Sequence, residues 1–462
     1  MKAQEEPGEV GSGPAEGRRQ RQLDAAVVRD TRGFASLKEE WDDLYRSCPS
    51  ATPFSSWEWL YTWWEFYGEG TYDLRLVTLR NESGLLVGLL PLMARRGLLL
   101  LLGGLSTDSY DGMTPYKDVL VREGWEEAVA QAGARALEEM GGWRVADLQE
   151  LMPHSAAWTI FREWQGPKTH VPIVGYVIIR AGSWEELLPS LSRNLRSIAR
   201  RTLRHAAQDG VSCQPAAPED AERAAGTLVR LHRELWRGRR IDPEDLTPRY
   251  EAYMRAAARR MTERGIGRVS EFRRQEDGEV LVSQFLLFDK DFVGVYVVGA
   301  SKEATGRYQF MTLCNWDATN LARRMNTSYV SWMFYISQDK MRWASEVVRS
   351  HRLILGRTNA LWVPYAGYHV SRDRYYSLLA SAQVYVHSKE APNVVRKAMT
   401  GYYGLQSYVH SEGAPRWVKS ITNAYYAIRH AYGYYALQYK YELIRTRRQM
   451  RGSSASRTQT KK

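Results

Sequence analysis

The chain has 462 residues, 12% of them aromatic, and a formal net charge of +12. This length allows two or three domains with full cores, and 16 Trp and 28 Tyr exclude disorder over most of the chain. The positive charge is concentrated in residues 193–204 and near the C-terminus. It indicates an anionic partner, such as a nucleotide, RNA or a membrane surface, or else a solvated basic face.

Cysteines and apolar runs limit the compartment and the kinds of site. Cys48, Cys213 and Cys314 are far apart and lack metal-ligand spacing, which argues against a disulfide framework and favours a reducing compartment. Residues 1–24 are polar and Gly/Pro-rich, without the apolar run of a signal peptide, and are predicted to be a disordered tail. The most apolar run, around residues 98–102, is far shorter than the roughly 20 residues of a membrane span. We therefore expect a cytoplasmic protein with no membrane span and no metal site.

Residues 25–180 are predicted to form one mixed α/β domain. A short strand precedes a helix that carries Phe34 and Trp41 on one face. A second helix, capped by Ser55 or Ser56, is so rich in tryptophan that some of its rings are expected to line a groove. The remaining elements are strands at 72–80, 85–92 and 97–105, a helix at 125–140, and strands at 145–148 and 174–179. Such alternation of strands and helices is typical of an α/β domain.

Residues 181–355 are predicted to form a second α/β domain. Its helices are expected from 183, at 191–204, at 221–236 and at 246–263, and its first strands at 268–274, 280–288 and 292–298. A loop at 299–306, a helix at 308–323 and a strand at 328–336 follow. Several α/β folds bind an anionic cofactor at the N-terminus of a helix that follows such a strand pair and loop.

The last part of the chain differs in composition. From residue 365 onward it holds 15 of the 28 tyrosines, at helical spacings such as Tyr432, Tyr435 and Tyr439. We interpret residues 356–447 as a helical appendage that rests on the other domains or on a partner. Residues 448–462 are basic and are predicted to be a disordered tail.

Several motifs are spread over both halves of the chain. The first half carries Thr52-Pro53-Phe54-x-Ser56-Trp57-x-Trp59-Leu60 and Leu86-Val87-Gly88-Leu89-Leu90-Pro91-Leu92. The second half carries Leu231-His232-x-x-x-Trp236-x-Gly238, a hairpin with Gln284 and Tyr296, and Lys340-x-Arg342-Trp343. Together these motifs resemble the CelD/FemAB-like branch of the GNAT acyltransferases over roughly residues 25–350.

This resemblance implies a mixed α/β fold with two tandem GNAT-like domains, followed here by the helical appendage. It also implies transfer of an acyl group from acetyl-CoA or another acyl-CoA to a small-molecule amine or amino sugar, in polysaccharide or cell-envelope synthesis. Relatives in this branch use aminoacyl-tRNA as the donor instead. The chain departs from the family pattern where the cofactor helix opens, because Tyr308-Gln309-Phe310 replaces a small Pro-Gly pair. Glycines there let backbone N–H groups approach a pyrophosphate.

Acyl transfer to an amine requires a base for the amine proton and donors for the developing oxyanion. Four residues are candidates for catalysis: Asp339, Lys340, Tyr296 and His232. Candidates for cofactor binding are Val297, Val298, Gly306 and Arg307, and candidates for substrate binding are Trp57, Asp108, Asp111, Gln284, Arg342 and Trp343.

Each of these candidates also has a purely structural interpretation, as a packed ring, a turn or capping acid, or an ion-pair partner. Two further hypotheses therefore stand beside the acyl-CoA-dependent enzyme. One is a non-catalytic GNAT-like module that binds a partner through the aromatic groove and the tyrosine-rich end. The other is an aminoacyl-tRNA-dependent transferase, in which the arginines of residues 193–204 contact RNA phosphates.

Overall fold

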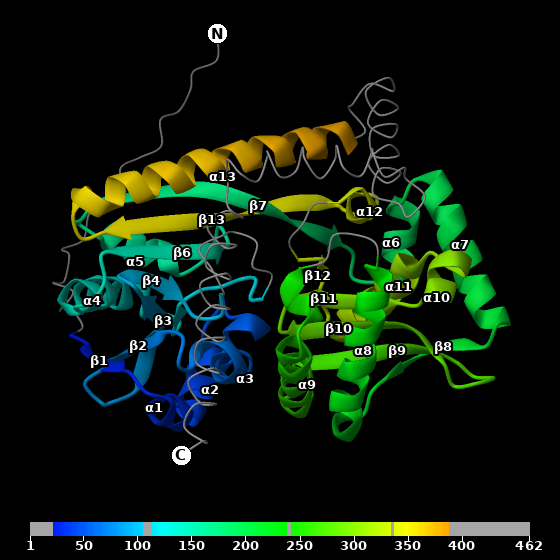
Figure 1. The fold of residues 1–462 in the computed structure, drawn as a ribbon, viewed down its shortest axis with the longest axis horizontal. Coiled ribbons are helices and arrows are strands. Elements are labelled where there is room, and N and C mark those ends of the chain that lie inside the picture. The colour runs from blue at the N-terminus through cyan, green and yellow to red at the C-terminus, as the bar shows by residue number, and fades with distance from the viewer. Residues whose placement is uncertain (1–21, 105–112, 238–241, 334–336, 388–462) are drawn as a thin grey trace, which may run out of the picture. The chain divides into compact units, whose positions relative to one another are not determined.

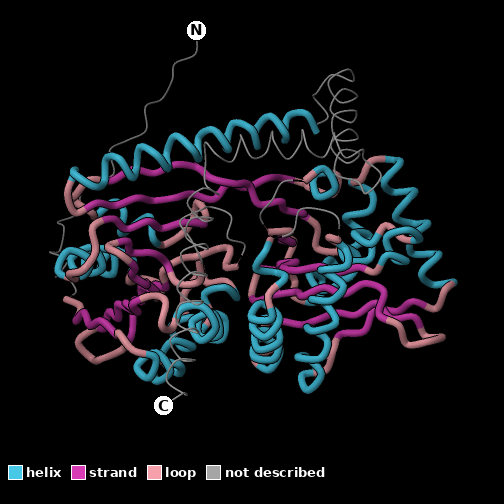
Figure 2. The backbone as a smooth tube through the Cα atoms, viewed as in Figure 1, coloured by secondary structure: helices cyan, strands magenta, loops and turns pink. Residues whose placement is uncertain are grey.

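The computed structural model describes residues 22–104, 113–237, 242–333 and 337–387. Asp108, Asp111 and the expected appendage beyond residue 387 lie outside the described residues. Within the described ranges the fold is mixed α/β, as the sequence predicts (Figures 1 and 2). None of the described helices is long and apolar enough to cross a membrane.

The first half of the chain forms five strands of the main sheet path and five helices. The strands are β1 (Asp24–Val28), β2 (Asp73–Arg80), β3 (Leu86–Arg95), β4 (Leu98–Leu101) and β6 (Val145–Leu151), with β5 (Leu120–Val121) paired to β3. The helices are α1 (Thr31–Ser36), α2 (Lys38–Arg46), α3 (Trp57–Trp63), α4 (Glu126–Glu139) and α5 (Ala157–Glu163). The predicted cap is confirmed at Ser56, whose hydroxyl accepts from the Trp59 N–H at 3.3 Å.

From residue 168 onward the chain contributes seven strands and eight helices in the described ranges. The strands are β7 (Lys168–Arg180), β8 (Val211–Pro215), β9 (Gly267–Arg274), β10 (Val280–Asp289), β11 (Phe292–Ala300), β12 (Tyr329–Ser331) and β13 (Glu346–Gly356). The helices are α6 (Trp184–Ser190), α7 (Arg193–Gln208), α8 (Ala221–Leu235), α9 (Pro248–Glu263), α10 (Lys302–Arg307), α11 (Phe310–Arg324), α12 (Gln338–Met341) and α13 (Asn359–His387). The predicted cap of α6 is confirmed, because the Ser183 hydroxyl accepts from the Glu186 N–H at 3.2 Å.

The described strands form one sheet in the order β1-β2-β3-β4-β6-β13-β7-β12-β11-β10-β9-β8. The pairs β4–β6 and β11–β12 are parallel, and the other pairs in this path are antiparallel. The sheet is therefore continuous across residue 180, where the sequence predicts a domain boundary. In addition, β13 belongs to the predicted second domain but lies between β6 and β7, two strands of the predicted first domain.

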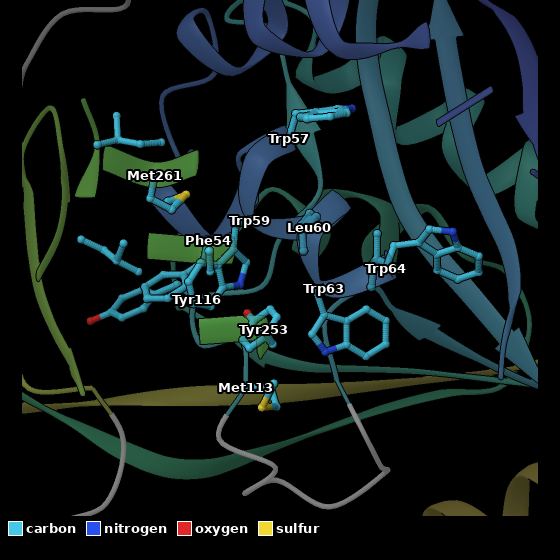
Figure 3. Close-up of a cluster of buried hydrophobic side chains, with 14 of the residues drawn as sticks. Phe54, Trp57, Trp59, Leu60, Trp63, Trp64, Met113, Tyr116, Tyr253 and Met261 are labelled. Atoms are coloured by element: carbon cyan, nitrogen blue, oxygen red, sulfur yellow. The ribbon is translucent and has the colours of Figure 1, made fainter. Parts of the chain in front are cut away.

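The tryptophan-rich segment is part of the core and does not line a groove. Trp41, Trp59 and Trp63 are fully buried, and Figure 3 shows Trp59 and Trp63 close to Phe54 and Tyr253. The helix α3 packs against α9, so side chains distant in sequence cover its aromatic rings. The excess of aromatic residues is explained by this contact, which joins elements of the two halves of the sequence.

Candidate functional site

Two neighbouring parallel strands, β11 and β12, separate at a defined point. Val293 is paired with Val330, and Gly294 with Ser331, and there the β11–β12 pairing ends. After Ser331 the chain stays next to β7, where the Trp332 N–H donates to the Val177 carbonyl at 2.9 Å. Strand β11 continues to Ala300. Within the described ranges, its second half has no strand on the β12 side, and we call this region the fork.

A β-bulge marks the fork on β11. Phe285 is paired with Val297 and Leu286 with Val295, so Tyr296 is the extra residue of the bulge. The Tyr296 hydroxyl donates to the Met113 carbonyl at 2.8 Å. This candidate catalytic tyrosine therefore anchors the chain next to residues 105–112, the segment that contains Asp108 and Asp111.

A buried cluster of hydroxyl groups lies on the β12 side of the fork. The Tyr116 hydroxyl donates to Ser331 Oγ at 2.7 Å and lies 3.1 Å from the Tyr329 hydroxyl. The Tyr176 hydroxyl accepts from the Tyr116 N–H at 3.4 Å and donates to Glu150 Oε2 at 2.7 Å. The sequence did not single out these residues, because Tyr116 and Ser331 are 215 positions apart and belong to no shared motif.

Backbone strain is concentrated around this cluster. Tyr116, Glu150 and Met333 have positive φ angles of 52°, 60° and 52°, which non-glycine residues rarely adopt. Such strain persists only where the surroundings enforce it, and it often accompanies functional sites. The Met333 side chain lies against β11 at its last residue paired with β12, since a Cβ at Gly294 would lie 2.1 Å from Met333 Cε. Burial raises the pKa of the Tyr116 phenol well above its ordinary value, so that it remains a hydrogen-bond donor.

His232 lies on α8, which packs against β11. Its Nδ1 is 2.8 Å from the Val298 carbonyl, and its Nε2 is 3.4 Å from Asp245 Oδ2. Because a carbonyl only accepts, Nδ1 carries a proton. Helix α8 approaches β11 closely, because a Cβ at Gly299 would lie 2.6 Å from the backbone nitrogen of His232. His232 therefore holds the backbone of β11 next to the half-buried Val297 and Val298.

Lys340, a candidate catalytic residue, lies close to the end of β12. Its Nζ donates to the Trp332 carbonyl at 2.8 Å, one residue beyond Ser331. Burial lowers the pKa of the Lys340 ammonium to about 8, so a large fraction is neutral at mildly alkaline pH. Its neighbour Asp339 and the nearby Arg342 are exposed.

Three of the residues predicted to contact substrate are buried in the interior. Trp57 is 8% exposed and donates to the Phe34 carbonyl, and Trp343 is 1% exposed and lies against Trp184. Gln284 is fully buried, and its Nε2 donates to Asp317 Oδ2 at 2.8 Å. Their side chains are used in packing and in buried hydrogen bonds, which the sequence could not distinguish from ligand contacts.

The expected cofactor position is the N-terminus of α11. The Gln309 side chain accepts from the Thr312 N–H at 2.7 Å, so one of the free N–H groups of the first turn is already satisfied. Arg307 forms a bidentate ion pair with Asp209, in which Nε lies 2.5 Å from Oδ2 and Nη2 lies 2.6 Å from Oδ1. This ion pair lowers the pKa of the Asp209 carboxyl to about 2. Gly306 is exposed in α10. The Gln309 side chain therefore occupies an N–H group that a pyrophosphate at this turn would use.

A basic surface lies on α7, which packs against α11. Arg193, Arg200, Arg201 and Arg204 are exposed and form no ion pair with the described residues. Thr202 faces α11, where its Oγ1 accepts from the Gln309 N–H at 3.4 Å. At 100° per residue, Arg193, Arg200 and Arg204 lie roughly opposite Thr202, so they face away from α11. These four arginines are available to a polyanion outside the fold.

Comparison with known proteins shows the relationships of the fold. Residues 193–335 match the family model described as an acetyltransferase (GNAT) domain. The crystal structure of FemX is similar with a TM-score of 0.51 and 12% identity, covering 70% of this chain and 97% of FemX. None of the curated proteins matches this sequence.

Two further solved structures are similar at TM-scores of 0.45. One is L-PGS from Bacillus licheniformis, with 12% identity over 72% of this chain and 96% of that one. The other is the C-terminal domain of a putative lysylphosphatidylglycerol synthetase from Agrobacterium fabrum, with 11% identity over 74% and 96%. The family-model match agrees with the predicted GNAT resemblance over residues 193–335, and the similarity to FemX confirms the mixed α/β fold predicted from the sequence.

Proposed function

Because residues 193–335 form a GNAT-type domain within a FemX-like fold, we propose that the protein transfers an activated acyl group to an amine at the fork. The observation that carries this proposal is the separation of β11 from β12 next to a strained hydroxyl cluster. Parting strands leave backbone N–H groups that can stabilise an oxyanion. The acceptor is a small-molecule amine or an amino sugar, as the resemblance implies.

The donor that fits best is an acyl ester carried by RNA. Gln309 closes the turn in which a pyrophosphate would bind, whereas the four arginines of α7 are exposed and unpaired among the described residues. Arginines on one helical face can contact successive phosphates of a nucleic acid. An aminoacyl-tRNA supplies both the polyanion and the activated ester.

The reaction forms a C–N bond and breaks the C–O bond to the ribose of the RNA. The amine nitrogen attacks the ester carbonyl, and its proton moves to the neutral Nζ of Lys340. The departing ribose oxygen takes up a proton from that ammonium or from solvent. Lys340 suits this role because burial lowers the pKa of its ammonium to about 8, which is close to the working pH of a general base.

The test is a transfer assay with labelled aminoacyl-tRNA as donor and glucosamine as the amine probe. Lys340→Met should lower the transfer rate by about 10²-fold or more, the effect typical of a lost general base. The matched control is Lys290→Met, because Lys290 Nζ also donates to backbone carbonyls, those of Tyr45 and Cys48, and lies outside the fork. Equal rates for the two variants would contradict the role of Lys340.

A second candidate donor is acyl-CoA, which the match to the acetyltransferase (GNAT) domain model favours. The same assay with labelled acetyl-CoA separates the two donors. Binding of RNA is checked independently, because four phosphate contacts predict a slope of about −3 to −4 in log K against log salt. Arg200→Gln with Arg204→Gln should reduce that slope by about two. Turnover with acetyl-CoA and none with aminoacyl-tRNA would replace the first donor with the second.

A further inference from the structure

The long helix α13 contacts the sheet through a largely polar side. Figure 1 shows it running along β7 and β13. His369, Asp373 and Ser377 are buried on this side. Asp373 Oδ2 lies 3.1 Å from Nε of the fully buried Arg352 on β13, and Ser377 accepts from Arg349 at 2.7 Å. Such a buried ionic contact fixes the rotation of the helix about its own axis, since no other rotation pairs these charges.

The opposite side of α13 is apolar and aromatic. Ten large hydrophobic side chains are exposed in the described residues, and seven of them lie on this one helix. They are Leu361, Val363, Tyr368, Tyr375, Tyr376, Leu378 and Tyr385. The helix thus directs the carboxylate of Asp373 toward the protein and leaves most of its large apolar side chains on the outside. An exposed apolar surface of this extent marks an interaction site.

The shape of the apolar surface distinguishes between kinds of partner. At 100° per residue, the exposed positions cover an arc of about 220° around the axis. A single partner helix contacts a much narrower seam, because a strict coiled-coil stripe uses only two positions in seven. A helix embedded to about half its diameter in a flat surface is covered over an arc of this width. The helix is 29 residues, or about 43 Å, long.

The chemistry of this surface is that of a membrane interface. Four of the seven exposed side chains are tyrosines, which combine an apolar ring with a hydroxyl that requires water or headgroup partners. The only acidic residue of α13 is the buried Asp373, whereas Arg374 is exposed on the outer side. A positive side chain without exposed acids on the same helix complements anionic lipid headgroups.

We propose that α13 docks this protein on the surface of an anionic lipid bilayer, lying in the plane of the interface. The inward Arg352–Asp373 contact turns the apolar side outward, and the tyrosines and Leu378 enter the headgroup region. This interaction is separate from the fork and does not depend on the acyl donor. It positions the protein on a membrane without a spanning helix among the described residues.

The test is co-sedimentation of the full chain with phosphatidylcholine vesicles that contain about one third phosphatidylserine. We expect binding that weakens by about tenfold or more in Leu378→Asp, because this change places a charge on a side chain that is 71% exposed and removes its apolar burial. Tyr375→Ser should weaken binding in the same direction. The matched control is Leu85→Asp, an exposed leucine in the turn between β2 and β3, which should bind as the unaltered chain does.

Two outcomes would overturn the proposal. One is equal vesicle binding by the unaltered chain and Leu378→Asp, since the arginines of α7 would then account for all the attraction. The other is a fall in molecular mass in sedimentation equilibrium for Leu378→Asp without any loss of vesicle binding. In that case a second copy of the chain, and not a bilayer, covers α13.

Discussion

Lys340 makes the stability of this protein depend on pH in a way that one substitution can isolate. Its Nζ is enclosed, donates to the Trp332 carbonyl, and has a pKa lowered by burial from 10.5 to about 8. In the unfolded chain the same group keeps its ordinary pKa of about 10.4. The folded protein therefore releases the proton of Lys340 at a lower pH than the unfolded chain does.

The magnitude follows from the difference between the two pKa values. At about 1.4 kcal/mol per pH unit, a pKa of about 8 against 10.5 corresponds to at most about 3 kcal/mol of destabilisation. The stem of the side chain is partly exposed, which makes this an upper limit. The full destabilisation is present below about pH 8, where both states are protonated. It disappears as the pH rises to about 10.5, because only the unfolded chain still holds the proton in that interval.

The measurement is urea denaturation of the unaltered chain and of Lys340→Met at intervals from pH 7 to pH 10.5. The difference in the free energy of unfolding, unaltered chain minus variant, should rise with pH by up to about 3 kcal/mol. Titrations shared by the two proteins cancel in this difference. A difference that stays constant over the interval would show that the pKa of Lys340 is not lowered. Lys340 would then not be suited to act as a base at the fork.

Two other changes test separate parts of the structure. Arg352→Met removes the cation that the buried carboxylates of Asp147 and Asp373 share and should destabilise the protein by about 3 kcal/mol, although Asp373 keeps its ion pair with Arg372. The exposed Arg349→Met should change stability by less than about 1 kcal/mol in the same denaturation assay, and equal effects would contradict the buried ionic contact. Gln309→Gly frees the Thr312 N–H and should strengthen acetyl-CoA binding in calorimetry, whereas unchanged affinity would refute the closed turn.

Much of the secondary structure could be predicted, because it depends on local chemistry. The hairpin expected at 280–288 and 292–298 is β10 and β11, and the helix expected at 308–323 is α11. Caps were predictable because the serine and the N–H group it accepts from are three residues apart. The strand expected at 328–336 was too long, since β12 ends at Ser331, where the chain turns to pair with β7.

The candidate site was predictable only in part. Motifs singled out His232, Tyr296 and Lys340, and the structure places His232 and Tyr296 next to β11 at the fork. The motifs also singled out Gln284 and Trp343, which are buried, because a residue type in a motif does not reveal its exposure. Asp108 and Asp111 remain predictions, since they lie outside the described residues.

The sequence by itself determined the mixed α/β class, most helix and strand positions and the GNAT resemblance, since periodicity, caps and motifs are properties of neighbouring residues. Tertiary structure alone decided what each of these elements faces. It brought Tyr116 to Ser331 across 215 residues, buried the tryptophans against α9, and turned the charged side of α13 inward. Such pairings depend on sheet order and helix packing, which join residues too distant along the chain for any local pattern to record.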